Sequence, residues 1–155
     1  RIMKFRDKYH QEFYEQMIMR AGCAGDHYRE ALFYTLGIID ETRRHIGDLY
    51  DFANHCPNFR SWKAAWQTSS SARVTRLAFN LYNGFNGGNA RGHDSAAQYT
   101  PYEIFCDAFM PWMFEAVKLL YPQHVDANAW DCKLDALLQQ ETKNKAERKD
   151  TIEHH

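Results

Sequence analysis

Apolar side chains recur at helical spacing along most of this chain, and an alternating pattern of strand length is hard to find. Near the start, four apolar residues follow one another at intervals of four: Phe5, Tyr9, Phe13 and Met17. This spacing predicts one apolar face of a first helix. Gly22 is expected to end that helix, because glycine readily adopts the left-handed conformation of a helix C-terminus.

Two more helices are predicted before residue 57. Asp26 is a candidate N-cap for a helix that carries Ala31, Leu32 and Leu36 and that Gly37 closes. Asp40 is expected to begin a third helix, with Ile46, Leu49, Tyr50 and Ala53 facing inward. The Cys56–Pro57 step should stop this helix, because the residue before a proline avoids the helical region.

The clearest amphipathic pattern covers residues 72–83, where the apolar positions are Val74, Leu77, Ala78, Leu81 and Tyr82. The cluster Ser69–Ser71 is expected to cap its start and Gly84 its end. The opposite stripe of this helix is polar and holds Arg73, Arg76, Asn80 and Asn83. A short turn between Ser61 and Gln67 would place Trp62 and Trp66 on one side, four residues apart.

The second half of the chain contains one long loop and two further helices. Residues 84–99 are rich in Gly and Asn and show no apolar period, which predicts a loop. Thr100-Pro101-Tyr102-Glu103 has the form of a capping box with Pro at the first helical position. It should start a hydrophobic helix over 101–120 that Pro111 kinks or breaks. A last helix is expected near 127–141.

These elements predict an all-α, single-domain bundle of five or six helices over residues 3–141, with the helices near 72–83 and 101–120 at its centre. Residues 142–155 form a charged tail that should fray. The terminal Glu153-His154-His155 has the look of an affinity-tag remnant.

Charge is distributed unevenly along the chain, although the net charge is only −1. Residues 52–93 contain five Lys or Arg and no Asp or Glu, whereas the net charges of residues 1–51 and 94–155 are −1 and −5. The middle of the chain is therefore expected to present positive charge that nothing neutralises. The balanced total argues against a protein that coats nucleic acid by charge alone.

The candidate binding residues lie in or beside this acid-free segment: Trp62, Trp66, Arg73, Arg76, Asn80, Asn83, Arg91 and His93. The arginines lie near a helix N-terminus that favours anions, and the tryptophans could stack on a partner. Each feature also has a structural interpretation. The polar stripe could simply be solvated or bridge to acids of a neighbouring helix, and the tryptophans could belong to the core.

Other chemistry has weaker support in the sequence. His93 next to Asp94 lacks a third converging group, and no nucleophile elbow, phosphate-binding loop or dinucleotide motif is present. A zinc site from Cys23, His27, His55 and Cys56 is conceivable, but two of these ligands are adjacent. We therefore expect no metal and no cofactor. The four cysteines form no Cys-x-x-Cys pair, and no apolar run could span a bilayer, which predicts free thiols and a cytoplasmic protein.

Three segments resemble a family of small, uncharacterised bacterial proteins carried by gut anaerobes and their mobile elements. They are residues 65–84 (AWQTSSSARVTRLAFNLYNG), 29–37 (REALFYTLG) and 48–51 (DLYD). The resemblance brings no activity and no catalytic residues with it. It implies at most a protein that binds and obstructs a host or rival machine, such as an antagonist of bacterial immunity.

The leading hypothesis is a non-enzymatic binding or regulatory module. Its basic, aromatic central segment would contact an acidic protein surface or a nucleic-acid backbone. The alternative is a small enzyme for a phosphate-containing or nucleic-acid substrate, with Arg73 and Arg76 as clamps and His93 as acid or base.

Overall fold

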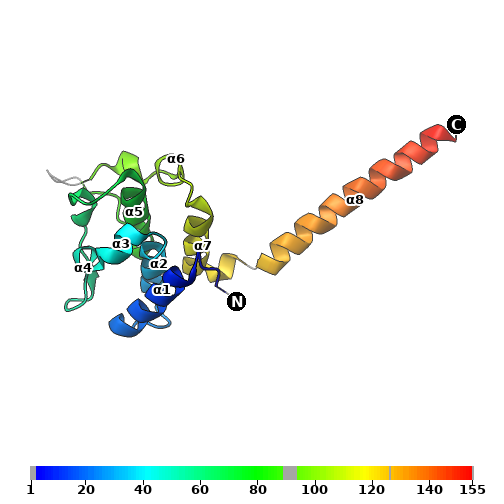
Figure 1. The fold of residues 1–155 in the computed structure, drawn as a ribbon. Helices are drawn as coiled ribbons and strands as arrows, with labels where there is room; N and C mark the ends of the chain where they lie inside the picture. The colour runs from blue at the N-terminus through cyan, green and yellow to red at the C-terminus, as the bar shows by residue number, and fades with distance from the viewer. Residues whose placement is uncertain (1–2, 89–93, 126, 155) are drawn as a thin grey trace. The chain divides into compact units, whose positions relative to one another are not determined.

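A computed structural model describes residues 3–88, 94–125 and 127–154 of the chain (Figure 1). Within them the fold is mostly helical, as the sequence predicts, with eight α-helices and one small two-stranded sheet. The chain divides into two compact units, residues 1–120 and 121–155. The first unit contains α1 to α7 together with the sheet, and the second contains α8.

Helix α1 (Lys8–Ala21) ends, and helix α2 (His27–Leu36) begins and ends, at the predicted capping residues. The start of α1 after Asp7 was not predicted. Asp7 accepts a hydrogen bond from the backbone N–H of His10, and Asp26 accepts two from Tyr28 and Arg29. Gly22 follows α1 with a φ of 60°, a left-handed conformation that glycine adopts without steric cost. The prediction for the apolar face of α1 was partly wrong. Tyr9 is 57% exposed, and Phe5 precedes the helix.

The buried face of α1 consists instead of His10, Phe13, Tyr14, Met17 and Ala21. Gly37, just after α2, allows α1 to come close, because a Cβ there would lie 2.7 Å from Cδ2 of His10 and 2.9 Å from Cδ1 of Phe13. His10 is fully buried and uses both ring nitrogens. Its Nδ1 accepts a hydrogen bond from the Arg6 backbone N–H at 3.1 Å, so its Nε2 donates to the Tyr34 carbonyl at 2.7 Å.

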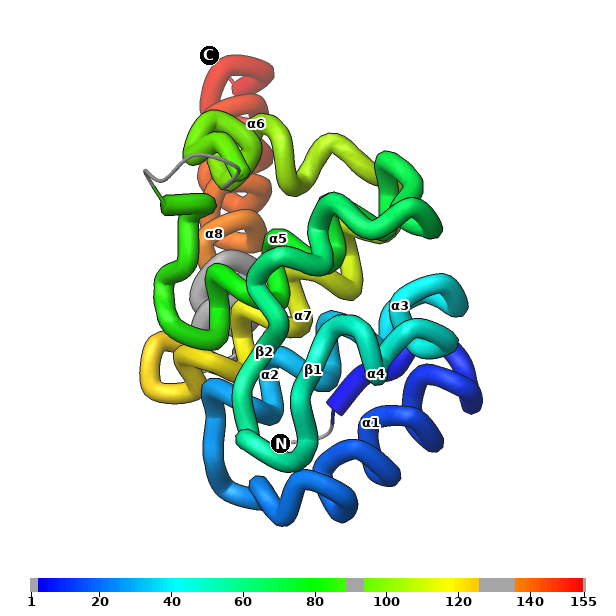
Figure 2. Tube along the Cα trace, turned by 90° about the vertical axis from the view of Figure 1, so that its left-hand side faces the viewer, coloured from blue at the N-terminus to red at the C-terminus, as the bar shows by residue number. Residues whose placement is uncertain are grey.

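The third predicted helix is divided. The segment forms α3 (Asp40–Arg44), α4 (Ile46–Leu49) and then strand β1 (Tyr50–Asp51), which pairs antiparallel with β2 (Cys56–Pro57). Asp51 explains the turn between the strands, because its carboxylate accepts hydrogen bonds from the backbone N–H groups of Ala53 and Asn54. The two strands run side by side in Figure 2.

Helix α5 (Ser69–Asn83) starts three residues earlier than predicted, after a short 3₁₀ helix, η1 (Ser61–Lys63). Its N-cap is Thr68 rather than one of the three serines. Thr68 and Ser71 cap each other's backbone N–H groups, as in a capping box. Gly84 ends α5 with a φ of 78°, as predicted.

The predicted helix over 101–120 is two helices, α6 (Pro101–Ile104) and α7 (Met110–Leu120), preceded by the 3₁₀ helix η2 (Ala96–Tyr99). The break falls at residues 105–109, before Pro111. Pro111 therefore lies in the first turn of α7, where its missing N–H costs no hydrogen bond.

The second unit consists of the 3₁₀ helix η3 (Pro122–His124) and α8 (Ala127–Glu153). Helix α8 continues well past residue 141, where the sequence analysis places the start of a frayed tail. Leu137 and Leu138 on this helix are both more than half exposed.

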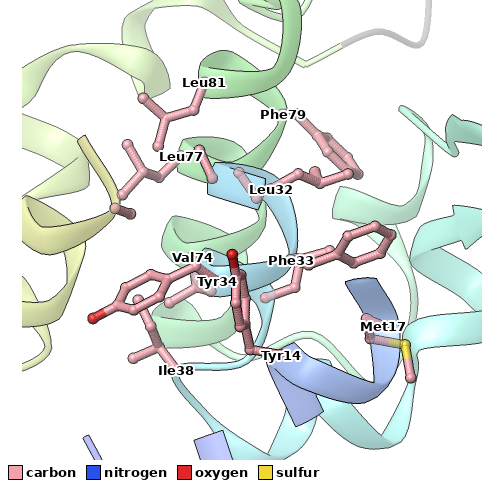
Figure 3. Packing of buried hydrophobic residues seen from close by; sticks show 14 of the residues in the cluster. Tyr14, Met17, Leu32, Phe33, Tyr34, Ile38, Val74, Leu77, Phe79 and Leu81 are labelled. Atoms are coloured by element: carbon pink, nitrogen blue, oxygen red, sulfur yellow. The ribbon is translucent and has the colours of Figure 1, made fainter. Parts of the chain in front are cut away.

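The core of the first unit is built around α2, which packs against α1, α5 and α7. Every residue from Ala31 to Leu36 is buried, so α2 shares the central place with α5, whereas the sequence pattern predicts the helices near 72–83 and 101–120 there. Figure 3 shows Leu32, Phe33 and Tyr34 of α2 among side chains of α1 and α5. Because the last six residues of α2 are buried all round and only Thr35 among them is clearly polar, the helix has little periodicity, which hides its central position from pattern analysis.

Candidate basic interface

Helix α5 presents Arg73 and Arg76 one turn apart on the face opposite to its buried residues. The absence of Asp and Glu around them in the sequence predicts that both guanidinium groups are free to bind a partner. Each is instead bonded to a carboxylate that follows the acid-free segment in the chain.

Arg76 forms a two-pronged ion pair with Asp94. Its Nε lies 2.6 Å from Oδ2 and its Nη2 lies 3.2 Å from Oδ1, with the side chains only 14% and 4% exposed. Two parallel N–H···O bonds of this kind are among the stronger hydrogen-bonded contacts in proteins. The guanidinium carbon also lies 5.8 Å from the ring centre of Trp62. Arg76 is therefore built into the fold.

The backbone of the loop that follows α5 brings Asp94 into place. Gly87 has a φ of 94°, and a Cβ at this position would lie 2.2 Å from the Asp94 carbonyl oxygen. Only glycine permits this approach. Asp94 also accepts a hydrogen bond from the Ser95 backbone N–H at 2.9 Å.

Tyr99 lies beside the same ion pair. Burial, together with the neighbouring Asp94 carboxylate, raises the pKa of the Tyr99 hydroxyl above its ordinary value. The hydroxyl is buried and meets no partner at ordinary hydrogen-bond geometry within the described residues, so Asp94 acts on it mainly through charge.

Arg73 contacts α6 and the segment between α6 and α7. Its Nε donates to the Glu103 carbonyl at 3.1 Å, and its Nη1 lies 3.3 Å from Oδ2 of Asp107. Asp107 is 5% exposed and also accepts hydrogen bonds from the Ser70 hydroxyl at 2.7 Å and the Phe109 backbone N–H at 3.1 Å. This carboxylate therefore connects the first turns of α5 with the start of α7.

Asn80 and Asn83 form hydrogen bonds with the backbone of the loop that follows α5. The Asn80 side-chain amide donates to the Phe85 carbonyl at 3.0 Å, and the Asn83 side-chain oxygen accepts from the Phe85 backbone N–H at 3.1 Å. Both contacts fix the chain where it leaves α5, which is a structural role.

The two tryptophans do not form one stacking platform. Trp62 is half-buried beside Arg76. Trp66 stacks on His45 with ring centres 4.2 Å apart and donates from Nε1 to Asp48 at 3.0 Å. One face of Trp66 is therefore already covered. Arg91 and His93 lie outside the described residues.

A comparison with known protein families shows which family the chain belongs to. The model of a family of unknown function, DUF6075, matches residues 1–133. The chain belongs to this family. No curated protein and no solved structure matches it. The DUF6075 match includes every candidate binding residue and ends within α8.

Within the acid-free segment of this DUF6075 protein, open charge lies in η1 and at the residue that precedes it. Arg60 and Lys63 flank Trp62, are exposed, and contact no carboxylate among the described residues. Both residues belong to the acid-free segment, but the sequence pattern favours the arginines of α5 as the binding site. The two pairs differ in their contacts with distant carboxylates. Asp107 and Asp94 reach the arginines of α5, and the local sequence around either pair carries no signal of this.

Within residues 3–88, 94–125 and 127–154, no three His, Cys, Asp or Glu side chains gather as a metal ion would need. Cys23 is buried, whereas Cys56 and Cys106 are exposed, and all three are free thiols. No helix in the same residues combines the length and apolar character needed to cross a bilayer.

Proposed function

We propose that this protein is a non-enzymatic binding or regulatory module that contacts an acidic protein surface through Arg60, Trp62 and Lys63. The observation that supports this proposal is the open charge of η1, where two exposed cations flank a half-buried tryptophan. Tryptophan and arginine are enriched among the residues that dominate protein interfaces, because they combine a large contact area with specific polar contacts.

A protein partner is favoured over nucleic acid. Binding to a phosphate backbone depends on several cations in a row, each of which releases counterions. Arg73 and Arg76 would have extended such a row, but Asp107 and Asp94 already neutralise them. The same ion pairs remove the clamps of the enzyme alternative, because neither guanidinium is free to hold a phosphate.

The resemblance to small proteins of gut anaerobes and their mobile elements supports a narrower proposal. In it, the module obstructs a host or rival machine, such as one of bacterial immunity. We place this action in the cytoplasm, and the free thiols of Cys23, Cys56 and Cys106 support that placement.

Affinity capture from the native host tests the proposal. Three baits are compared by mass spectrometry: wild type, Arg60→Ala/Lys63→Ala, and Lys4→Ala/Lys8→Ala, which removes the same charge from another exposed place. We expect a partner that the first double variant loses and the second retains. Nuclease treatment should leave that partner bound. Equal recovery with all three baits would overturn the proposal, and loss on nuclease treatment would replace the protein partner with nucleic acid.

A further inference from the structure

The last turns of α1 and the loop after it form a second surface, of the opposite charge. A groove of about 520 Å³ lies there, lined by Tyr14, Glu15, Ile18, Met19, Gly22 and Ala24. Its walls are mostly apolar. Met19 is 81% exposed, so most of this flexible side chain contacts nothing in the described fold.

Neither Glu15 nor Glu30 forms an ion pair with a Lys or Arg among the described residues. Arg20 lies in the same last turn of α1, but its guanidinium carbon lies 3.8 Å from the ring centre of Phe52. Glu15 is exposed, and its carboxylate accepts a hydrogen bond only from the uncharged Gln11 side chain, at 3.0 Å. Beneath the groove, Glu30 accepts from the Tyr14 hydroxyl at 3.3 Å, and its other oxygen lies 3.3 Å from Nδ1 of His27.

The burial of Tyr14, and then the charge of Glu30, raise the pKa of the Tyr14 hydroxyl. The hydroxyl therefore stays neutral and adds no charge of its own. The C-terminal end of a helix also carries a partial negative charge from its aligned peptide dipoles. The groove lies at this end of α1, where Gly22 caps the helix. Glu15, Glu30 and the C-terminal end of α1 thus each add negative electrostatic potential at the groove.

We propose that this groove binds a basic, amphipathic peptide segment of a partner protein. An apolar side chain of that segment would pack against Ile18, Met19 and Ala24, and a Lys or Arg next to it would lie over Glu15. A methionine suits this role, because its unbranched, polarisable side chain adapts to varied partners. Anionic lipids and nucleic acids do not fit, since their phosphates would be repelled. The inference goes beyond the function proposed above, because it concerns another face and a partner of opposite charge.

Fluorescence anisotropy with a short amphipathic peptide of leucine and lysine tests this inference, and a peptide with glutamate in place of lysine serves as its control. We expect the basic peptide to bind the wild-type protein at least about tenfold more tightly than the acidic one. Methyl NMR should locate its contacts at Ile18 and Met19.

Matched variants separate the groove from general attraction to an acidic protein. Met19→Ser and Glu15→Lys should each weaken binding by about fivefold or more. Met110→Ser removes an exposed methionine from α7, and Glu12→Lys makes the same charge change one turn earlier on α1, outside the groove. Both control variants should bind within about twofold of wild type.

Equal weakening by Glu12→Lys and Glu15→Lys would overturn the inference, because it would mean non-specific charge attraction. An unchanged affinity of Met19→Ser would overturn it as well. Self-association of the wild type that Met19→Ser abolishes would assign the groove to a second copy instead. None of these outcomes depends on Arg60 or Lys63, so this test and that of the proposed function fail separately.

Discussion

Two parts of the acid-free segment differ in whether carboxylates neutralise their positive charges. On α5, Arg73 and Arg76 are bonded to Asp107 and Asp94 and serve the fold. At η1, which lies well before α5 in the chain, the side chains of Arg60 and Lys63 stay exposed to water. The comparison teaches that a block of like charge in a sequence does not define a charged surface. What decides is whether packing brings a carboxylate from elsewhere in the chain.

The largest expected effect comes from breaking the more buried ion pair. Asp94→Ala leaves the Arg76 guanidinium, which is 14% exposed, without its counter-charge, so the free energy of unfolding should fall by about 3 kcal/mol or more. Urea unfolding measures this change. The control is Arg44→Ala, whose partner Asp40 lies 2.7 Å away, with both side chains 62% exposed. That surface pair should contribute less than about 1 kcal/mol. Similar losses in both variants would remove the distinction between buried and open charge.

The buried imidazole of His10 extends the comparison of buried and exposed charges to a group that stays neutral in the folded protein. Burial, the largest cause, lowers the pKa of His10 from 6.5 to about 4. Above pH 6.5 both folded and unfolded forms are neutral. Between pH 6.5 and 4 only the unfolded chain takes up the proton, so stability should fall as the pH falls, by about 3 kcal/mol in total.

Urea unfolding at several pH values between 6.5 and 5 isolates this effect. His10→Gln should remove the pH dependence that His10 causes, whatever its effect on stability at pH 7. His55→Gln changes an exposed histidine and should leave the pH dependence as in wild type. An identical pH dependence for wild type and His10→Gln would contradict the buried, neutral state of His10.

Removing the carboxylate partner of Arg73 should lower stability less than removing that of Arg76. Asp107→Ala removes the acceptor of Ser70, Arg73 and the Phe109 backbone N–H. Arg73 is 29% exposed, so water can partly solvate its charge, and we expect a loss of about 2 kcal/mol. The measurement is again urea unfolding. A loss larger than that of Asp94→Ala would reverse the ranking by burial.

The open residues should give the smallest change in stability. Arg60→Ala/Lys63→Ala removes two exposed cations without carboxylate partners, so the free energy of unfolding should change by less than about 0.5 kcal/mol. Thermal and urea unfolding test this expectation. A loss of 2 kcal/mol or more would mean that these residues, too, belong to the fold.

Local features of the fold could be predicted from the sequence, and contacts between distant segments could not. The caps Asp26, Gly22 and Gly84 act over one helical turn, so residue type alone identifies these helix ends. The hairpin of β1 and β2 was missed because strands of two residues are too short to show a period. The central position of α2 was missed for a related reason, since its last six residues are all buried and show no period.

The candidate site follows the same rule. The polar stripe of α5 was found by its period, but its partners Asp94 and Asp107 lie 18 and 34 residues from the arginines that they bind. No charge count along the chain can locate such contacts. The structural interpretation, in which the stripe bridges to acids from elsewhere, is the one that the geometry supports for both arginines.

Hydrogen exchange at the arginine Nε–H groups, followed by ¹⁵N NMR, tests this account most directly. Arg76 donates its Nε–H to Asp94 and Arg73 donates its Nε–H to Glu103, whereas the Arg60 side chain is exposed. We expect slow exchange for Arg76 and Arg73 and fast exchange for Arg60. Fast exchange at all three arginines would contradict the account, because the charge of α5 would then be open to solvent.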